Sequence, residues 1–107
     1  MTHAIVTFCT CPDKATAEKI ARVLVEGALA ACVNILPNIT SIYSWQGQIE
    51  SAEEYLLIIK SPQKGYQAIE SAILNQHPYE LPEIIAVPIA HGLPEYINWI
   101  HSCHATN

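Results

Sequence analysis

The feature that most constrains the fold is one extended segment, residues 31–60, which is interrupted only by Pro37 and by a turn at Gln46-Gly47. If that turn is a two-residue hairpin loop, its arms are about 14 residues each, at least twice the usual length of a strand. The register of such a hairpin pairs Trp45 with Gln48, Tyr43 with Glu50, Ile35 with Ile58 and Val33 with Lys60. Because proline has no backbone N–H to donate to a sheet, we expect Pro37 to mark a bulge or a bend.

The distal end of this hairpin is too long to lie within a small globule. An arm of about 14 residues spans about 46 Å, whereas a chain of about 100 residues has a radius of gyration of about 13 Å. The protruding end nevertheless carries large apolar side chains on both faces, namely Ile42, Tyr43, Trp45 and Ile49. An isolated two-stranded ribbon is marginal in water, and exposed strand edges invite pairing. We therefore expect other copies of the chain to cover this ribbon; the alternative is a twisted hairpin folded back over its own sheet.

The rest of the chain alternates between strand and helix patterns. Residues 4–9 form a short β-prone run, and Asp13 is the expected N-cap of an amphipathic helix whose apolar stripe begins at Ala17. A second helix is expected to start at Ser61-Pro62 and to end by His77-Pro78.

Residues 83–90 form the last expected strand, and a terminal helix restarts near Gly92. The continuous apolar run of that strand indicates burial on both faces, whereas Pro88 favours an edge or a bulge. The resulting order, β-α-β-β-α-β with an additional C-terminal helix, predicts an α+β, ferredoxin-like sandwich with a protruding hairpin. We expect residues 1–107 to form a single domain.

Composition narrows the possible partners of the chain. Of its 107 residues, 50% are apolar and only 14% are charged, against roughly 25% charged in a usual soluble domain. Five basic residues against ten acidic ones disfavour nucleic acid, and no apolar run reaches the roughly 18 residues of a membrane span. The N-terminus lacks the pattern of an export signal, so we expect a cytoplasmic protein with reduced thiols.

Two sequence clusters could carry chemistry. In Cys9-Thr10-Cys11 both sulfurs lie on the same side of a strand, where they could help to hold Cu(I) or Zn(II). Alternatively, one sulfur fills space in the core and the other lies at the end of the strand. Residues 77–83 concentrate an imidazole (His77), a phenol (Tyr79), two carboxylates (Glu80 and Glu83) and two prolines in seven residues. The polar side chains of that segment could line a pocket or an intersubunit cleft. Alternatively, Pro78 ends a helix, Pro82 starts a strand, and the polar side chains attach the loop to its neighbours.

Two further groups of polar residues favour less specific interpretations. His101 and His104 have a spacing that can share a metal ion, but their place near the chain end favours a solvated tail, which we expect to fray over residues 105–107. Glu50, Glu53 and Glu54 form an acidic cluster on the hairpin, for which a solvated rim is the expected interpretation.

Two strings carry a family resemblance. Residues 30–35 read Ala-Ala-Cys-Val-Asn-Ile and are followed in order by Pro37, Ile39, Ser41, Tyr43, Trp45 and Gly47; residues 77–84 read His-Pro-Tyr-Glu-Leu-Pro-Glu-Ile. Together they closely resemble the CutA family of divalent-cation tolerance proteins. The resemblance implies a ferredoxin-like subunit assembled as a homotrimer. It also implies a link to copper binding and to tolerance of copper and other divalent cations.

The resemblance also points to a metal cluster proposed in family members. Its cysteine matches Cys9 and its glutamate matches Glu83, but Gln76 stands where the family has a histidine. An amide oxygen is a poor ligand for Cu(II) or Zn(II), and the adjoining His77 could substitute for the missing imidazole. The candidate ligands are therefore Cys9, Cys11, His77 and Glu83, with copper or another divalent metal ion and no organic cofactor.

These observations leave one preferred function and two alternatives. The preferred function is a trimeric metal-binding protein of metal homeostasis. The first alternative is a PII-like sensor or signalling scaffold, but its usual anionic ligands need clustered basic residues or glycine-rich loops, and the chain has only five bases and four glycines. The second is an enzyme that uses a thiolate-imidazole pair; because no active-site motif supports it, we expect no catalytic activity.

Overall fold

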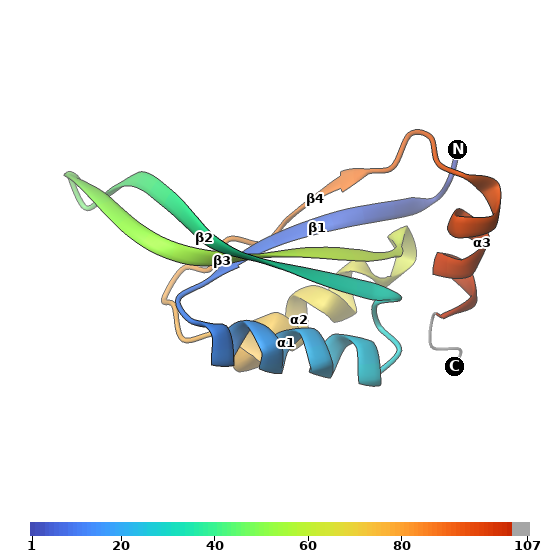
Figure 1. Cartoon of the computed structure of the whole chain (residues 1–107), viewed down its shortest axis with the longest axis horizontal. Helices are drawn as coiled ribbons and strands as arrows, with labels where there is room; N and C mark the ends of the chain where they lie inside the picture. Colours follow the sequence, from blue (N-terminus) through green and yellow to red (C-terminus); the bar gives the residue numbers. More distant parts are fainter. Residues whose placement is uncertain (104–107) are drawn as a thin grey trace.

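A four-stranded antiparallel sheet in the order β2-β3-β1-β4 organises the chain (Figure 1). Its strands are β1 (Ala4–Cys11), β2 (Cys32–Trp45), β3 (Gln48–Pro62) and β4 (Ile85–Pro88). The helices are α1 (Lys14–Glu26), α2 (Tyr66–Gln76) and α3 (Pro94–Ser102), with a short 3-10 turn at Gln63–Gly65. The structure is a computed structural model that describes residues 1–103, so His104 and the expected fraying end lie outside the described residues.

The expected α+β class and element order are confirmed. Helices α1 and α2 lie side by side on one face of the sheet, whereas α3 lies at the end of the sheet far from the hairpin tip (Figure 1). Among the described residues, no helix combines the length and the apolar character needed to cross a bilayer.

Helix α1 begins as the sequence predicts. The Asp13 carboxylate accepts a hydrogen bond of 2.8 Å from the backbone N–H of Thr16, which satisfies one of the free donors of the first turn. The predicted start of the second helix is wrong, because Pro62 is the last residue of β3 and α2 begins only at Tyr66. Its predicted end is confirmed: His77 is extended, as the residue before Pro78 is expected to be.

The long hairpin has the predicted register at its tip and a shifted one at its base. Trp45 pairs with Gln48 and Tyr43 pairs with Glu50, as predicted, but Ile35 pairs with Leu57 and Val33 with Ile59. The two proximal predictions are therefore wrong by one residue. The reason is the bulge expected at Pro37: β2 has two residues between Leu36 and Ile39 where β3 has one, and the second of them, Asn38, has a positive φ of 61°.

Strand β4 lies at an edge of the sheet, in agreement with the expectation drawn from Pro88. The expectation of burial on both faces is wrong, because all four β4 residues are exposed and β4 pairs only with β1. A short apolar edge strand is thus left uncovered by the described residues of the chain itself.

The main core lies between the sheet and the two helices α1 and α2. Its buried side chains include Cys9, Cys11, Ile20, Leu24, Leu57, Ile59, Ile69 and Ile73. A smaller cluster of Ala4, Ala31 and Ile100 attaches α3 to the sheet. The two cysteines of β1 are therefore part of the packed interior, and solvent does not reach them.

The hairpin extends beyond the packed layers (Figure 1), and the molecule measures 44 × 25 × 21 Å along its principal axes. Ile42 and Ile49 near the tip are 74% and 77% exposed. The alternative in which the hairpin folds back over its own sheet is therefore not the arrangement observed.

One core residue carries an unsatisfied polar group, which gives a first prediction. Thr7 is fully buried, and its hydroxyl has no hydrogen-bond partner. We expect Thr7→Val to raise the free energy of unfolding by about 1 kcal/mol, because valine keeps the shape and removes the buried hydroxyl. Urea denaturation at fixed protein concentration measures this change, and Thr7→Ser, which keeps the hydroxyl and loses the methyl group, should have the opposite sign. A loss of stability in Thr7→Val would show that the hydroxyl has a partner.

Candidate functional site

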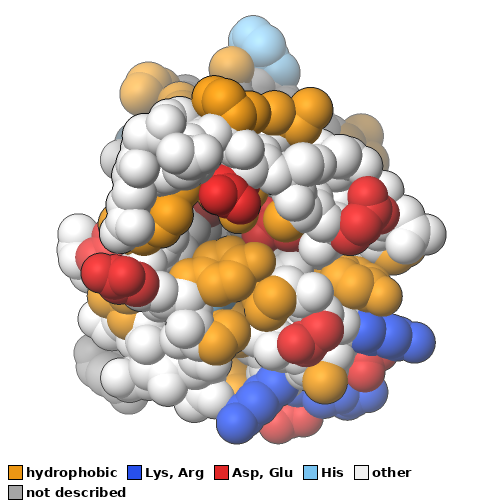
Figure 2. All heavy atoms as spheres, turned by 90° about the vertical axis from the view of Figure 1, so that its left-hand side faces the viewer, with side chains coloured by type: hydrophobic (Ala, Val, Ile, Leu, Met, Phe, Trp, Pro, Cys, Tyr) orange, Lys and Arg blue, Asp and Glu red, His pale blue; other side chains and the backbone are white. Residues whose placement is uncertain are grey.

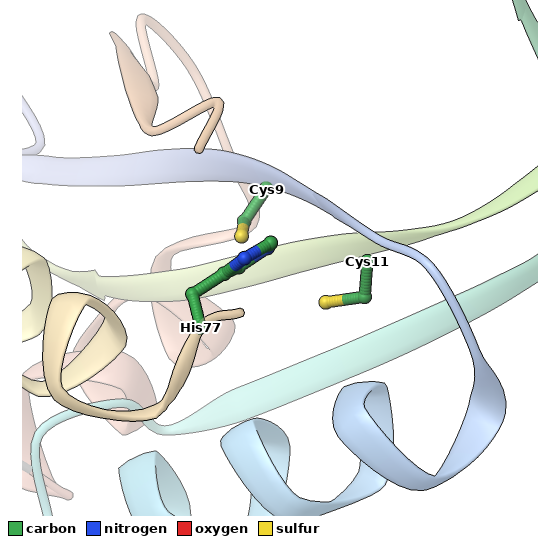
Figure 3. A group of neighbouring side chains, drawn as sticks. All are labelled: Cys9, Cys11 and His77. Carbon is green, nitrogen blue, oxygen red and sulfur yellow. The ribbon is translucent and has the colours of Figure 1, made fainter. Parts of the chain in front are cut away.

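Three potential metal ligands gather where β1 ends and α2 has just ended. The thiols of Cys9 and Cys11 and the imidazole of His77 have ligand atoms that all lie within 4.8 Å of one another. Figure 3 shows both cysteine side chains directed from β1 toward the ring of His77, which projects from the segment after α2. Residues far apart in the sequence thus form one compact group of two sulfurs and one nitrogen.

Local structure explains why these side chains meet. Successive side chains of a strand point to opposite faces, so Cys9 and Cys11 share the face of β1 that packs against the helices. Helix α2 crosses the same face and stops at Gln76, which leaves His77 beside the two sulfurs. The expected substitution of His77 for the family histidine is therefore geometrically feasible.

The ring of His77 is held by two hydrogen bonds. Its Nε2 donates to the carbonyl oxygen of Thr10 at 2.7 Å, and its Nδ1 accepts from the backbone N–H of Tyr79 at 3.2 Å. This pair of partners assigns the ring proton to Nε2, since a carbonyl oxygen can only accept and an amide N–H can only donate. A metal ion bound to His77 must therefore displace at least one of these two partners.

The two thiols differ in their acid strength. The hydrogen bond from Cys9 to Cys11, and then burial, raise the pKa of the Cys9 thiol far above its usual range. The same interaction with Cys9 lowers the pKa of the Cys11 thiol. Both thiols must lose their protons before they can act as thiolate ligands of a metal ion.

The donor set fits a soft metal ion. Thiolate and imidazole suit Cu(I) and Zn(II), whereas Mg²⁺ and Ca²⁺ require oxygen ligands. Two sulfurs on a tetrahedral ion lie about 3.7 Å apart. Ligand atoms within 4.8 Å of one another therefore need only a modest contraction, although both sulfurs are fully buried and an ion must enter through the half-buried side of His77.

Glu83, the fourth predicted ligand, does not join this group. It lines an adjoining cavity of about 790 Å³ between the hairpin and the segment from Pro78 to Glu83. Thr10 connects the two sites, because its backbone carbonyl receives the His77 hydrogen bond while the residue also lines the cavity. The structure thus separates the four predicted residues into a cluster of three and a neighbour.

The cavity contains a residue whose role sequence reasoning missed. Glu54 belongs to the acidic cluster that we expected to be a solvated rim, but it is only 6% exposed. Its Oε2 accepts a hydrogen bond of 2.6 Å from the hydroxyl of Tyr79. No local sequence pattern signals this burial, because Tyr79, which holds the carboxylate, is 25 residues away in the chain.

The cavity alters the titration of the groups around it. Burial, the hydrogen bond to Glu54 and the charge of that carboxylate raise the pKa of the Tyr79 phenol well above its usual range. Burial, and secondly the charge of Glu54, also raise the pKa of the Glu83 carboxyl. The lining of the cavity holds three carboxyl groups, Glu54, Glu80 and Glu83, and no lysine or arginine.

The sequence comparison gives a family and a relative. Residues 5–103 match the model of the family described as CutA1 divalent ion tolerance protein. Protein CutA of Mus musculus is 47% identical over 94 residues, which are 88% of this chain and 53% of that protein. The chain thus spans about half the length of the mouse relative.

Solved structures share the same fold. CutA from Xylella fastidiosa is 46% identical, with a TM-score of 0.93 over 96% of this chain and 99% of that chain. A PII-like protein CutA from Nostoc sp. PCC 7120 is 35% identical, with a TM-score of 0.88 over 94% and 97% of the two chains. CutA from Archaeoglobus fulgidus, described as periplasmic, is 38% identical, with a TM-score of 0.90 over 94% and 97%.

Proposed function

Since the chain belongs to the CutA1 divalent ion tolerance family, we propose that it binds copper, or another metal ion that prefers sulfur and nitrogen ligands, as part of metal homeostasis. Cys9, Cys11 and His77 are the ligands in this proposal, with Glu83 close enough to contribute charge to Cys9. The single observation that supports it is the convergence of two thiols and one imidazole within 4.8 Å. A bound ion supplies positive charge, which would stabilise both thiolates in the buried site.

The proposal requires the site to open and to lose protons when metal enters. Thiol ligands must be deprotonated, so the apparent affinity should rise with pH. His77 must release the carbonyl of Thr10 or the amide of Tyr79. Loading should therefore be slow relative to an exposed site, since the sulfurs lie in the core.

A competition titration tests the assigned ligands. Cu(I) is titrated under reducing conditions against a coloured chelator, with the wild-type protein, Cys11→Ser and Cys32→Ser. We expect Cys11→Ser to weaken the affinity by about 100-fold or more, because it removes a thiolate ligand. Cys32→Ser is the matched control, since Cys32 is a free, half-buried cysteine outside the cluster.

Two outcomes would contradict the metal assignment. Equal affinities of the wild type and Cys11→Ser would remove the site, and an equal loss in Cys32→Ser would show a general thiol effect. A repeat of the titration with Zn(II) distinguishes the preferred ion without changing the assigned residues.

Assembly and location complete the proposal. We place the protein in a reducing compartment such as the cytoplasm, which agrees with four free cysteines, although the relative from Archaeoglobus fulgidus is described as periplasmic. The assembly is a homotrimer formed through Ile42, Tyr43, Trp45 and Ile49 of the hairpin. The exposed apolar hairpin tip and the uncovered β4 edge support self-association.

A PII-like sensor or scaffold without catalytic activity is the second candidate. The observation in its favour is the similarity to the Nostoc structure, which is described as PII-like. A thermal-shift screen of nucleotides against metal ions separates the two functions. Stabilisation by a nucleotide and not by Cu(I) or Zn(II) would favour the sensor.

A further inference from the structure

The cavity beside Cys9, Cys11 and His77 is lined by acidic and aromatic side chains. It lies between the inner face of the hairpin and the segment from Pro78 to Glu83, and its volume of about 790 Å³ falls in the usual range for small-molecule sites. Figure 2 looks onto this end of the molecule and shows a hollow with hydrophobic and acidic side chains within it. The lysine and arginine side chains visible on this face gather at its lower edge, away from the hollow.

Glu54 is the strongest feature of the cavity. Its side chain is more than nine-tenths buried, yet it lines the cavity and no lysine or arginine does so. Tyr79 donates one neutral hydrogen bond to Oε2, which leaves the negative charge without a cationic partner in the cavity wall. A buried carboxylate is normally paired with a cation, because burial of an uncompensated charge is costly.

The other walls suit an organic cation. Tyr43, Trp45 and Tyr79 contribute aromatic rings, and Glu83 contributes a second carboxyl group. Aromatic faces attract ammonium groups, while their apolar area accepts the hydrocarbon part of a ligand. Because Glu54 and Glu83 line the same cavity, a cation bound between them would be attracted by two carboxyl groups.

We propose that this cavity binds a small protonated amine, with the ammonium group at Glu54 and Glu83 and a short apolar part against Tyr43, Trp45 and Tyr79. Tyr43 and Trp45 are 44% and 37% exposed, so in the proposed trimer one side of each ring would line the cavity and the exposed side would meet the neighbouring copy. This site is separate from the proposed metal cluster and goes beyond the proposed metal function. The bound amine would supply the cation that the buried carboxylate of Glu54 lacks, and its apolar part would cover the aromatic walls of the cavity.

Metal ions and anions fit the cavity less well than an amine. Among the described residues, Glu54, Glu80 and Glu83 do not form a group with the spacing of a metal site, whereas Cys9, Cys11 and His77 do. Anionic ligands such as nucleotides would meet carboxylates with no basic side chain in the lining. The aromatic walls also offer nothing to a hydrated divalent ion.

Calorimetric titration of the whole 107-residue chain with 2-phenylethylammonium near neutral pH tests the proposal. We expect saturable binding to the wild type and an affinity about tenfold lower for Glu54→Gln, which keeps an acceptor for Tyr79 and loses the charge. Glu18→Gln on the exposed surface of α1 makes the same change in net charge and should stay within about twofold of the wild type. Glu83→Gln is a second cavity variant, expected to weaken binding in the same direction.

Neutral and competing probes complete the test. 2-Phenylethanol has a closely similar shape without the charge and should show no saturable binding. Equal binding of the alcohol, an equal loss in Glu18→Gln and Glu54→Gln, or no saturable binding of the amine would each overturn the proposal. The last result would also follow if a neighbouring copy of the chain filled the cavity. Cys11→Ser should bind the amine as the wild type does, so failure of the metal site and failure of this site are distinguishable.

Discussion

Replacing both Ile42 and Ile49 with lysine should dissociate the proposed trimer into folded monomers. The wild type should have a mass about three times that of the 11.8 kDa chain, and the double variant the mass of a single chain. The two isoleucines lie on one face of the ribbon, because Ile42 pairs with Ser51 and the pair two positions along joins Ser44 to Ile49. Lysine on an exposed ribbon opposes pairing with another chain, since its charge would have to be desolvated.

Size-exclusion chromatography with light scattering measures this change at micromolar concentration, and far-UV circular dichroism reports whether the variant is folded. Leu74→Lys is the control, because it places the same charge on an exposed leucine of α2, away from the hairpin. A monomeric wild type would contradict the assembly outright. If the double variant kept the trimer mass, the interface would have to lie outside this face of the hairpin.

The free energy that favours assembly comes from surface that the subunit cannot cover by itself. Ile42 and Ile49 are about three-quarters exposed, and Tyr43 and Trp45, which line the cavity, are still 44% and 37% exposed. Burial of about 100 Å² of apolar surface contributes about 2.5 kcal/mol. Several such side chains in each of several copies could therefore stabilise a specific assembly, even after the cost of association.

The sequence predicted the hairpin well because its determinants are local. The turn at Gln46-Gly47 sets the pairing of Trp45 and Tyr43, and the absence of an N–H on proline correctly indicated the bulge. The proximal pairs were missed because a bulge shifts every pair beyond it by one residue. The position of a bulge is visible in a sequence, but its consequence for register depends on which strand takes the extra residue.

The candidate site was only partly predictable for a related reason. Alternation along a strand places Cys9 and Cys11 on one face, but the approach of His77 depends on where α2 stops and how it packs. Glu83 was grouped with these residues by resemblance, whereas in the structure it lies outside the cluster of three and lines the adjoining cavity together with Glu54. The burial of Glu54 arises from tertiary covering by residues 78–83, which no local pattern encodes.

Ile69→Ala should lower the free energy of unfolding by about 2–5 kcal/mol, a large part of the stability of a domain of this size. Ile69 is 0% exposed and packs in the same core as Cys9, Cys11 and Leu57. The matched control is Leu74→Ala on the same helix, which is 55% exposed and should change stability by less than about 1 kcal/mol. Urea denaturation at fixed protein concentration measures both, because assembly makes apparent stability depend on concentration.

The same pair of variants distinguishes a metal ligand from a core filler. If Cys9 and Cys11 only fill space, Cu(I) should not offset the loss caused by Ile69→Ala. If they bind the ion, saturating Cu(I) should raise the stability of wild type, Leu74→Ala and Ile69→Ala alike, since binding to the folded state alone adds a free energy set by affinity and concentration. If Cu(I) still stabilised the double variant Cys9→Ser/Cys11→Ser, the ion would bind elsewhere, and the two sulfurs would only fill space in the core.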